Sequence, residues 1–450
     1  MAASRKMPPD LIGRLIKHWP DELSGQCSFE VGLSGGLDSV ALLSLLCGVR
    51  EEMPGLRLSA VHVHHGLSPN ADAWARHCEQ LCAALQVPLR VARVAVTAAG
   101  GDSLEAAARD ARYAAYRESA AGVVVLAHHL DDQAETVLLQ LLRGGGAKAL
   151  AAMPALRPLA GGKLLWRPLL ALTRAELEAH VRRQSLAWVE DESNQDTRYR
   201  RNLLRLEVLP RIERGVPHYR RHLARAAALQ ADAAAILQEV ADADLRACRC
   251  EAGLSLPALA ALSGPRQRQS VLAWIESLGW SAPEPGALLE FLRQAHHAAG
   301  SPQLALPAGH LLRFADTLQA WPKVQLSHGS EVLPDCRGGR ALSLPAWGGE
   351  LSWEWRERGL PDAALAGLWL ALRRGGEKLP AQVGRREVKD LLREAGLPPL
   401  LRQRWPLLYG ADGQLLALPG IAISFVHSTG PGWWPRWTPV RAGHGDPARA

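Results

Sequence analysis

Short apolar runs alternate with longer amphipathic stretches through the N-terminal part of the chain. Such runs are typical of buried strands, and apolar residues three or four positions apart are typical of helices. The expected strands are 29–33, 58–64, 89–96, 123–127 and 164–170, and the expected helices between them are 39–49, 72–85 and 104–120. Strands that alternate with helices predict a doubly wound, Rossmann-like parallel sheet of the α/β class, with helices on both faces.

The pattern changes towards the C-terminus. From about Leu203 the chain is expected to be helical without strands, and a small α+β region is expected from about Leu368, after a segment rich in glycine and tryptophan. A chain of this length suggests about three domains. The expected boundaries are 1–215 for the sheet domain, 216–330 for a helical domain, 331–367 for a linker, 368–440 for the C-terminal domain and 441–450 for a disordered tail.

Composition limits the compartment and the partners. The formal net charge of +7 favours a polyanionic partner. The 7 cysteines form no C-x-x-C pair, which argues against a disulfide framework, a zinc site or an iron–sulfur site. We find no signal peptide and no apolar run of membrane-spanning length, so a cytoplasmic location without a membrane partner is expected. The sequence leaves the oligomeric state open, a homodimer included.

A turn rich in serine and glycine joins the first expected strand to the first expected helix. It consists of Ser34, Gly35, Gly36, Leu37, Asp38 and Ser39. The two glycines let the backbone turn tightly near an anion, and the N–H groups that open the helix point at that anion. The two serines add hydroxyl donors. No Gly-Lys-Ser/Thr follows, so the turn is not a Walker loop. It predicts a phosphate-binding loop.

Carboxylates gather at the end of the fourth expected strand. Asp131, Asp132 and Glu135 follow an apolar run, where acidic side chains are costly unless they meet a cation. Asp132 and Glu135 share one helix face, and with Asp38 they could meet a magnesium ion on the ATP phosphates or a substrate amine. The alternative is an acidic helix start stabilised by the helix dipole, which accounts well for Asp131.

Histidines and arginines accompany these two motifs. His64 ends one expected strand and His128 and His129 end another, so they should face the same crevice as the Ser/Gly turn. Either of the latter two could act as a base or contact a phosphate, although a lone histidine is more often structural. Arg109 and Arg112 lie three positions apart on a helix face, where they either pair with acidic neighbours or line the crevice.

Arginines far outnumber acidic residues in the segment 196–225. A solvated charged helix usually mixes its signs. This segment, which includes Arg201 and Arg205, therefore suits a phosphate backbone, with Tyr199 or Tyr219 available to stack on a base.

Together these motifs carry a family resemblance. The SGGLDS turn resembles the pyrophosphate loop (PP-loop) of the N-type ATP pyrophosphatases, which adenylate a substrate oxygen. The ordered set of SGGLDS, AHHLDDQAET, RGGG, RPLL and DESNQDTRYRRNLLR is similar to the tRNA(Ile)-lysidine synthetase family. The segments RRGGEK and GRREVKDLL resemble that family's C-terminal tRNA-binding domain. One departure is 146–150, where the family usually carries more glycine.

The resemblance implies a ligase that uses ATP and Mg²⁺ to join L-lysine to C2 of the wobble cytidine of tRNA(Ile) with a CAU anticodon, through an adenylated tRNA. The implied catalytic residues are Asp38, Arg109, Arg112, His129, Asp132 and Glu135, with Asp38 and Asp132 as metal ligands. The implied ATP-binding residues are Ser34, Gly35, Gly36, Leu37, Asp38, Ser39 and His64. The implied tRNA-binding residues are Arg201, Arg205, Arg373, Arg374, Lys378, Arg385, Arg386 and Lys389.

Three alternatives compete with this interpretation. A tRNA thiolation enzyme shares the loop but would need a sulfur-carrying cysteine pair or cluster. GMP or argininosuccinate synthesis would not explain the basic segments. A non-catalytic tRNA-binding protein with a decayed loop would not be expected to keep Ser34, Asp38, Ser39 and Asp132.

Overall fold

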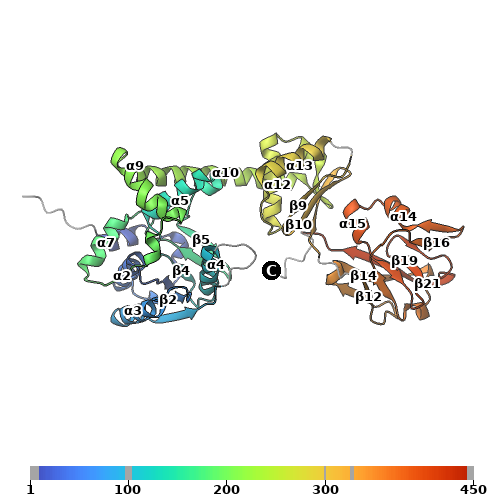
Figure 1. Cartoon of the computed structure of the whole chain (residues 1–450), viewed down its shortest axis with the longest axis horizontal. Coiled ribbons are helices and arrows are strands. Elements are labelled where there is room, and N and C mark those ends of the chain that lie inside the picture. Colours follow the sequence, from blue (N-terminus) through green and yellow to red (C-terminus); the bar gives the residue numbers. More distant parts are fainter. Residues whose placement is uncertain (1–9, 97–103, 298–299, 325–328, 443–450) are drawn as a thin grey trace, which may run out of the picture. The chain divides into compact units, whose positions relative to one another are not determined.

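The structure is a computed structural model of the chain, and it describes residues 10–96, 104–297, 300–324 and 329–442 (Figure 1). The chain divides into two compact units, Met1–Ala235 and Ile236–Ala450. Most of the expected tail, 441–450, lies outside the described residues. Within the described ranges, no helix has the length and apolar character that crossing a bilayer requires.

A six-stranded sheet forms the centre of the first unit, in the order β3-β2-β1-β4-β6-β5. Its strands are β1 (Ser28–Gly32), β2 (Arg57–His64), β3 (Leu89–Arg93), β4 (Val123–Val125), β5 (Leu156–Leu159) and β6 (Lys163–Trp166). β1 pairs in parallel with β2 and with β4, and β6 is parallel to β4, whereas β5 is antiparallel to β6. The predicted parallel sheet is confirmed, and the strand order reverses beside β1, where ligands of such sheets bind.

The helices and helical turns of this unit are α1 (Leu11–Lys17), η1 (Asp21–Leu23), α2 (Leu37–Glu52), α3 (Ala71–Ala84), α4 (Leu104–Arg117), α5 (Leu130–Leu142), α6 (Ala147–Leu150), α7 (Arg174–Arg183), η2 (Glu192–Gln195), α8 (Arg200–Leu203), the π-helical turn η3 (Leu204–Val208) and α9 (Leu209–Gly215).

The two faces of the sheet bury different apolar clusters because side chains alternate along a strand. On β4, Val123 and Val125 belong to the same cluster as Leu42 of α2. Val124 belongs to a second cluster with Tyr116 of α4. α2 and α4 therefore cover opposite faces of the sheet.

The arginine-rich segment returns to the sheet domain. Ala134 of α5 packs against Leu209 of α9 and Tyr219 of α10 (Tyr219–Cys248), a helix that continues into the second unit. Tyr219 is 3% exposed. It is therefore not free to stack on a base as the sequence suggested, whereas Tyr199 is exposed.

The second unit begins with helices and an antiparallel sheet in the order β7-β8-β11-β10-β9. Its elements are β7 (Arg249–Cys250), β8 (Gly253–Ser255), α11 (Leu256–Ala260), α12 (Gly264–Ser277), α13 (Pro285–His297), β9 (Gln303–Leu306), β10 (Gly309–Phe314) and β11 (Thr317–Pro322). The expectation of helix without strand missed this sheet. In β9 only Leu304 and Leu306 are buried, a period of two that is too short to stand out in the sequence.

The rest of the unit is richer in strands than in helices. It contains β12 (Ser330–Val332), β13 (Leu342–Leu344), η4 (Pro345–Trp347), β14 (Gly349–Gly359), η5 (Asp362–Leu365), β15 (Trp369–Ala371), β16 (Lys378–Pro380), β17 (Arg385–Glu387), α14 (Val388–Glu394), α15 (Pro399–Arg404), β18 (Leu407–Tyr409), β19 (Leu415–Leu418), β20 (Ala422–Ile423) and β21 (Gly430–Pro439).

The expected linker, 331–367, is a folded part of this region. β14 pairs along its length with β21, and Trp347, Leu351 and Leu360 are buried in a cluster shared with Leu407. Within the segment rich in glycine and tryptophan, Trp347 and Trp353 are core residues, and Gly348 has the positive φ of a turn. The boundary at 331 is therefore corrected.

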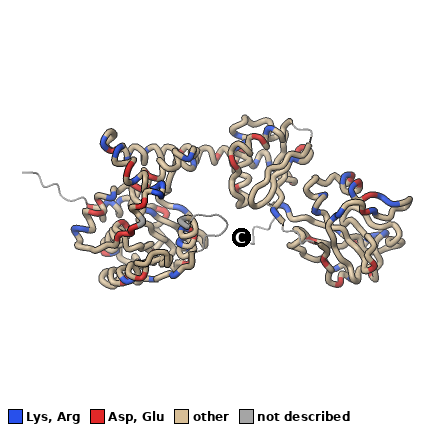
Figure 2. The backbone as a smooth tube through the Cα atoms, viewed as in Figure 1, with Lys and Arg blue, Asp and Glu red and all other residues tan. Residues whose placement is uncertain are grey.

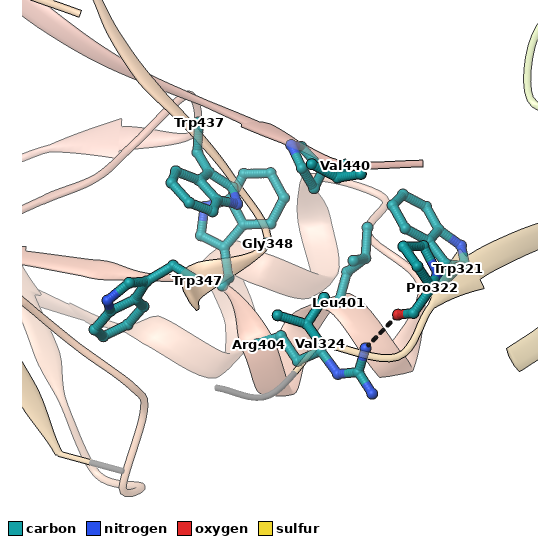
Figure 3. Close-up of a pocket in the computed structure, with 11 residues that line it drawn as sticks. Trp321, Pro322, Val324, Trp347, Gly348, Leu401, Arg404, Trp437 and Val440 are labelled. Atoms are coloured by element: carbon teal, nitrogen blue, oxygen red, sulfur yellow. Dashed lines mark hydrogen bonds between the residues drawn. The ribbon is translucent and has the colours of Figure 1, made fainter. Parts of the chain in front are cut away.

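A small cavity lies in this unit between Trp347, Trp437 and Arg404, whose Nη1 donates to the carbonyl oxygen of Pro322 (Figure 3). Its volume of about 20 Å³ holds about one water molecule. It is too small for a nucleotide.

Candidate active site

The Ser/Gly turn forms a closed loop between β1 and α2. The Ser34 and Ser39 hydroxyl oxygens lie 3.1 Å apart, and the Ser39 hydroxyl donates to the carbonyl oxygen of Gly36 over 2.9 Å. Gly35 has φ +85°, and a Cβ there would meet Val189 at 3.0 Å. The amide of Val189 also donates to the Gly35 carbonyl over 2.9 Å. Sequence and geometry thus agree that this position needs glycine.

Asp38 stands in the first turn of α2, next to the buried Leu37. Its Oδ1 is buried without a hydrogen-bond partner in the part of the chain that the structure describes. His129 Nε2 lies 3.5 Å from this oxygen and Arg174 Nε lies 3.8 Å from it. A buried carboxylate oxygen without a hydrogen bond is suited to a cation or a substrate donor.

His129 is the N-cap residue of α5, at the end of the segment that follows β4. Its backbone amide donates to Asp132 Oδ2 over 3.0 Å, and its Nε2 lies 3.5 Å from the same oxygen. Burial alone would lower the pKa of His129, but the neighbouring carboxylates of Asp38, Asp132 and Asp131 outweigh burial and raise this pKa. The site therefore favours a protonated imidazole beside the phosphate loop.

The carboxylates of α5 are already paired with arginines. Arg201 places Nη2 2.6 Å from Asp132 Oδ1 and Nε 2.7 Å from Glu135 Oε2. Arg205 Nε lies 2.6 Å from Glu135 Oε1. Burial works against the charge of Asp132, but His129 and Arg201 outweigh it and hold the pKa of this carboxyl below its usual range.

These ion pairs alter the expected roles of the α5 carboxylates and of the two arginines. Asp132 and Glu135 are buried on α5, next to His129, and a magnesium ion or a lysine amine would have to replace Arg201 and Arg205. These two arginines, expected on the tRNA, lie in the site itself. Their pairing could not be foreseen, because the partners are 66 and 70 positions apart in the chain.

Asp131 connects α5 to α7 and α10 through hydrogen bonds. Its Oδ2 accepts a 2.9 Å hydrogen bond from the amide of Arg174, the first residue of α7, and its Oδ1 accepts from Arg220. These contacts favour the structural interpretation of Asp131. Arg174 belongs to no motif recognised in the sequence, whereas Arg220 belongs to the arginine-rich segment 196–225 that was expected to contact RNA.

His64 ends β2, but it already has partners. Its Nε2 lies 3.1 Å from Asp72 Oδ1 and 3.4 Å from Arg93 Nη1. Its role in ATP binding remains a prediction.

Arg109 and Arg112 lie on α4, on the face of the sheet opposite α2. The Arg109 guanidinium stands over the ring of Tyr113, 4.9 Å from its centroid, and Arg157 of β5 stands 5.3 Å from the same centroid. Arg112 lies near His65. Burial and the charge of Arg112 together lower the pKa of His65 to about 4. Sequence reasoning did not single out Tyr113 or Arg157.

The expected tRNA contacts of the C-terminal region lie on α14, β16, β17 and the segment before β16. Arg374, Lys378, Arg385, Arg386 and Lys389 are exposed, and Arg373 is half-buried. Arg386 pairs with Glu394, and Lys389 pairs with Glu387 at 2.7 Å. Along the backbone in Figure 2, acidic residues alternate with basic ones in this region. The surface is therefore mixed in sign, with Arg385 free of a carboxylate partner among the described residues.

No cluster of three or more histidine, cysteine or acidic side chains is preformed to hold a metal ion within the ranges that the structure describes. Of the two expected ligands, Asp38 has an open carboxylate oxygen, whereas both oxygens of Asp132 are engaged.

A Ser-Gly-Gly loop between the first strand and helix of a parallel sheet, facing an acidic helix beyond β4, defines a nucleotide-binding domain of the PP-loop class. The family model for a PP-loop domain matches residues 12–212. Those described as the TilS substrate binding domain and the TilS substrate C-terminal domain match 254–319 and 368–434.

Curated relatives cover nearly the whole chain. The tRNA(Ile)-lysidine synthase of Chromobacterium violaceum is 68% identical over 95% of this chain and 99% of its own length. The enzymes of that name from Pseudomonas aeruginosa and Escherichia coli O157:H7 are 42% and 38% identical, over 93% and 88% of this chain and 94% and 95% of their own lengths. The chain belongs to the tRNA(Ile)-lysidine synthase family.

Proposed function

We propose that this chain joins L-lysine to C2 of the wobble cytidine of tRNA(Ile) with a CAU anticodon, in the cytoplasm and at the expense of ATP. The observation that carries the proposal is the meeting of the Ser34–Ser39 loop with His129 and the α5 carboxylates at the reversal point of the sheet. The family relationship supplies the substrates.

The first step is adenylation. Cytosine O2 attacks the α-phosphorus of ATP, and the bond to the β-phosphate breaks to release pyrophosphate. The N–H groups of the loop and of the first turn of α2, with the Ser34 and Ser39 hydroxyls, hold phosphate oxygens. A protonated His129 stabilises the negative charge that develops there.

Of the two expected ligands, Asp38 is the one that fits a magnesium ion in the described structure. The buried, unpartnered Oδ1 of Asp38 is an oxygen ligand of the kind that Mg²⁺ prefers. When bound, the ion would neutralise charge on the phosphate oxygens. Asp132 would join it only after release from Arg201.

The second step joins the amine to the base. The ε-amine attacks C2, the bond from C2 to the adenylated oxygen breaks, and AMP leaves. Asp132 and Glu135 orient the incoming ammonium group and accept the proton that it loses before the attack. Arg201 and Arg205 turn to RNA phosphates when the anticodon loop enters. This exchange reconciles the ion pairs of the structure with the two roles expected from the sequence.

Incubation with unmodified tRNA(Ile) transcript, ATP and labelled lysine, followed by nucleoside analysis, tests the function. A labelled lysidine nucleoside is expected, together with AMP and pyrophosphate in equal amounts. Thiolation is the rival activity, and the described cysteines Cys27, Cys47, Cys78, Cys82, Cys248, Cys250 and Cys336 are all unpaired. A thiolated nucleoside, or none at all, would overturn the proposal.

A further inference from the structure

Three arginines surround one tyrosine on the α4 face of the sheet domain. We call Arg109, Arg157, Arg167 and Tyr113 the arginine cluster. Arg109 Nη2 lies 3.4 Å from the Tyr113 hydroxyl oxygen, and the Arg157 guanidinium stands over the Tyr113 ring. Arg167 directly follows β6 and interacts with the same phenol. The RPLL motif of the sequence begins with this arginine.

Among the described residues, the arginine cluster has no anionic partner. None of its three arginines pairs with a carboxylate in the part of the chain that the structure describes. Arg167 is only 4% exposed; its Nη1 donates to the carbonyl of Pro154 over 2.8 Å, but its buried Nε has no partner. A buried guanidinium beside two like charges is costly unless an anion joins it. The exposed Arg109 leaves the cluster open to solvent.

The arginine cluster is separate from the phosphate loop, so an anion bound by the cluster would not be held by the loop. The loop leads into α2, whereas the cluster is carried by α4, β5 and β6, and α2 and α4 cover opposite faces of the sheet. The first unit thus has two separate places for oxyanions at the carboxyl edge of one sheet.

His128 links the cluster to the α5 carboxylates. The amide of Leu126 donates to Trp166 over 2.9 Å, which places the residue before Arg167 beside the segment leading to His128. His128 experiences the charge of Asp132 as well as those of Arg167 and Arg109. The Asp132 carboxylate and unpaired arginines therefore act on the same imidazole. This arrangement complements a molecule with an ammonium group at one end and a carboxylate at the other.

We propose that the arginine cluster binds the α-carboxylate of the amino-acid substrate while Asp132 and Glu135 receive its ε-ammonium group. The proposal rests on the function proposed above. The planar guanidinium forks suit bidentate binding of a carboxylate, and the Tyr113 hydroxyl adds a donor. The cluster would make the enzyme select lysine over diamines and over lysine derivatives without a free carboxylate.

Lysinamide tests the proposal because it replaces the carboxylate by a neutral amide of nearly the same shape. The full-length enzyme is given saturating tRNA(Ile) transcript and ATP, and kcat/KM is measured for lysine and for lysinamide. The wild type is expected to prefer lysine. Arg157→Gln should lower kcat/KM for lysine by about tenfold to a hundredfold, the worth of a charged hydrogen bond, and leave kcat/KM for lysinamide nearly unchanged.

Arg167→Gln should remove the preference more completely, but Arg167 is buried and this variant also tests folding. Arg157 is half-buried, so Arg157→Gln carries the test if Arg167→Gln does not fold. Arg117→Gln, at the exposed end of α4, is the matched control and should keep the preference of the wild type.

Several results would overturn the proposal without touching the proposed function. Equal kcat/KM values of the wild type for lysine and lysinamide would show that no group of the enzyme binds the carboxylate. Slower pyrophosphate release by Arg157→Gln without lysine would assign the cluster to ATP, and weaker tRNA binding would assign it to RNA phosphates. Failure of the wild type to form any lysidine would instead refute the proposed function.

Discussion

His129 Nε2 lies 3.5 Å from Asp38 Oδ1, so one side chain from each of the two sequence motifs meets at the edge of the sheet. The contact joins the phosphate loop to the acidic helix α5. Because Asp132 lies at the same distance from this nitrogen, the imidazole stands between two carboxylates. The two carboxylates favour a protonated imidazole, and its positive charge lies where pyrophosphate leaves ATP.

Asp38→Asn is expected to lower adenylation by at least about a hundredfold, since it removes the one carboxylate with an open oxygen at the loop. Affinity for tRNA should stay nearly unchanged, because Asp38 does not serve the nucleic acid. Pyrophosphate release and filter binding measure the two quantities. Asp21→Asn, an exposed aspartate in η1, is the control. Wild-type release by Asp38→Asn would refute the assignment.

Asp132→Asn is expected to impair lysine transfer more than formation of the adenylated tRNA. Its carboxylate is proposed to orient the amine, which enters only in the second step. Single-turnover pyrophosphate release without lysine is compared with lysidine formation when lysine is present. If both fall equally, Asp132 belongs to the ATP step.

Glu135→Gln should destabilise α5 by about 3 kcal/mol, because it leaves two partly buried guanidinium groups without their carboxylate. Hydrogen exchange of the α5 amides measures this loss. The exposed pair Glu178 and Arg182, 2.7 Å apart, is the comparison, and Glu178→Gln should cost less than about 1 kcal/mol. Similar losses in both variants would mean that burial contributes nothing to the α5 network.

Replacing Arg385 and Arg386 with alanine should weaken tRNA binding and flatten its salt dependence. Arg386 already pairs with Glu394, so the slope should change by about one unit rather than two. Titrations at several salt concentrations give the slope, and ATP binding should not change. Arg337→Ala, which removes an exposed arginine paired with Asp335, is the control. An unaltered slope in the double variant would make Arg385 and Arg386 ordinary solvated residues.

The first unit should lose stability as the pH falls from about 6.5 to about 4. Burial, with Arg112, His62 and His64, lowers the pKa of His65 to about 4, so the unfolded chain takes up a proton in this window before the folded chain does. The partial exposure of His65 limits its share to about 1 kcal/mol.

His65→Gln should therefore flatten the fall of the unfolding midpoint over this pH range, as measured by urea denaturation. His18→Gln, at an exposed histidine, serves as the control. If His65→Gln keeps the wild-type pH dependence, the loss of stability arises from other groups.

The local parts of the site were predictable from the sequence, and its long-range parts were not. The loop 34–39 and the ends of β1 and β4 follow from apolar runs and glycine, because neighbours along the chain decide them. The cluster around Tyr113 depends on β5, a short strand with a central proline that gave no strand signal. Arg157 therefore could not be placed beside Tyr113 in advance.

The second unit shows the same limit. Tryptophans between 347 and 355 suggested a linker because glycines lie among them. Yet Trp347 and Trp353 are buried in a cluster that includes Trp437 of β21, which lies far along the chain. Composition alone does not distinguish a flexible segment from a strand whose partner comes much later.

The hydrogen bond from Val189 to the Gly35 carbonyl has a consequence for how this enzyme can vary. Val189 supports the phosphate loop from behind, and only a short stretch of chain separates it from Arg201, which reaches Asp132. Contacts at Val189 and at Arg201 hold both ends of this stretch, so the number of residues between them is fixed. An added or deleted residue between them would pull one anchor away from its partner, although no reacting group would have been altered.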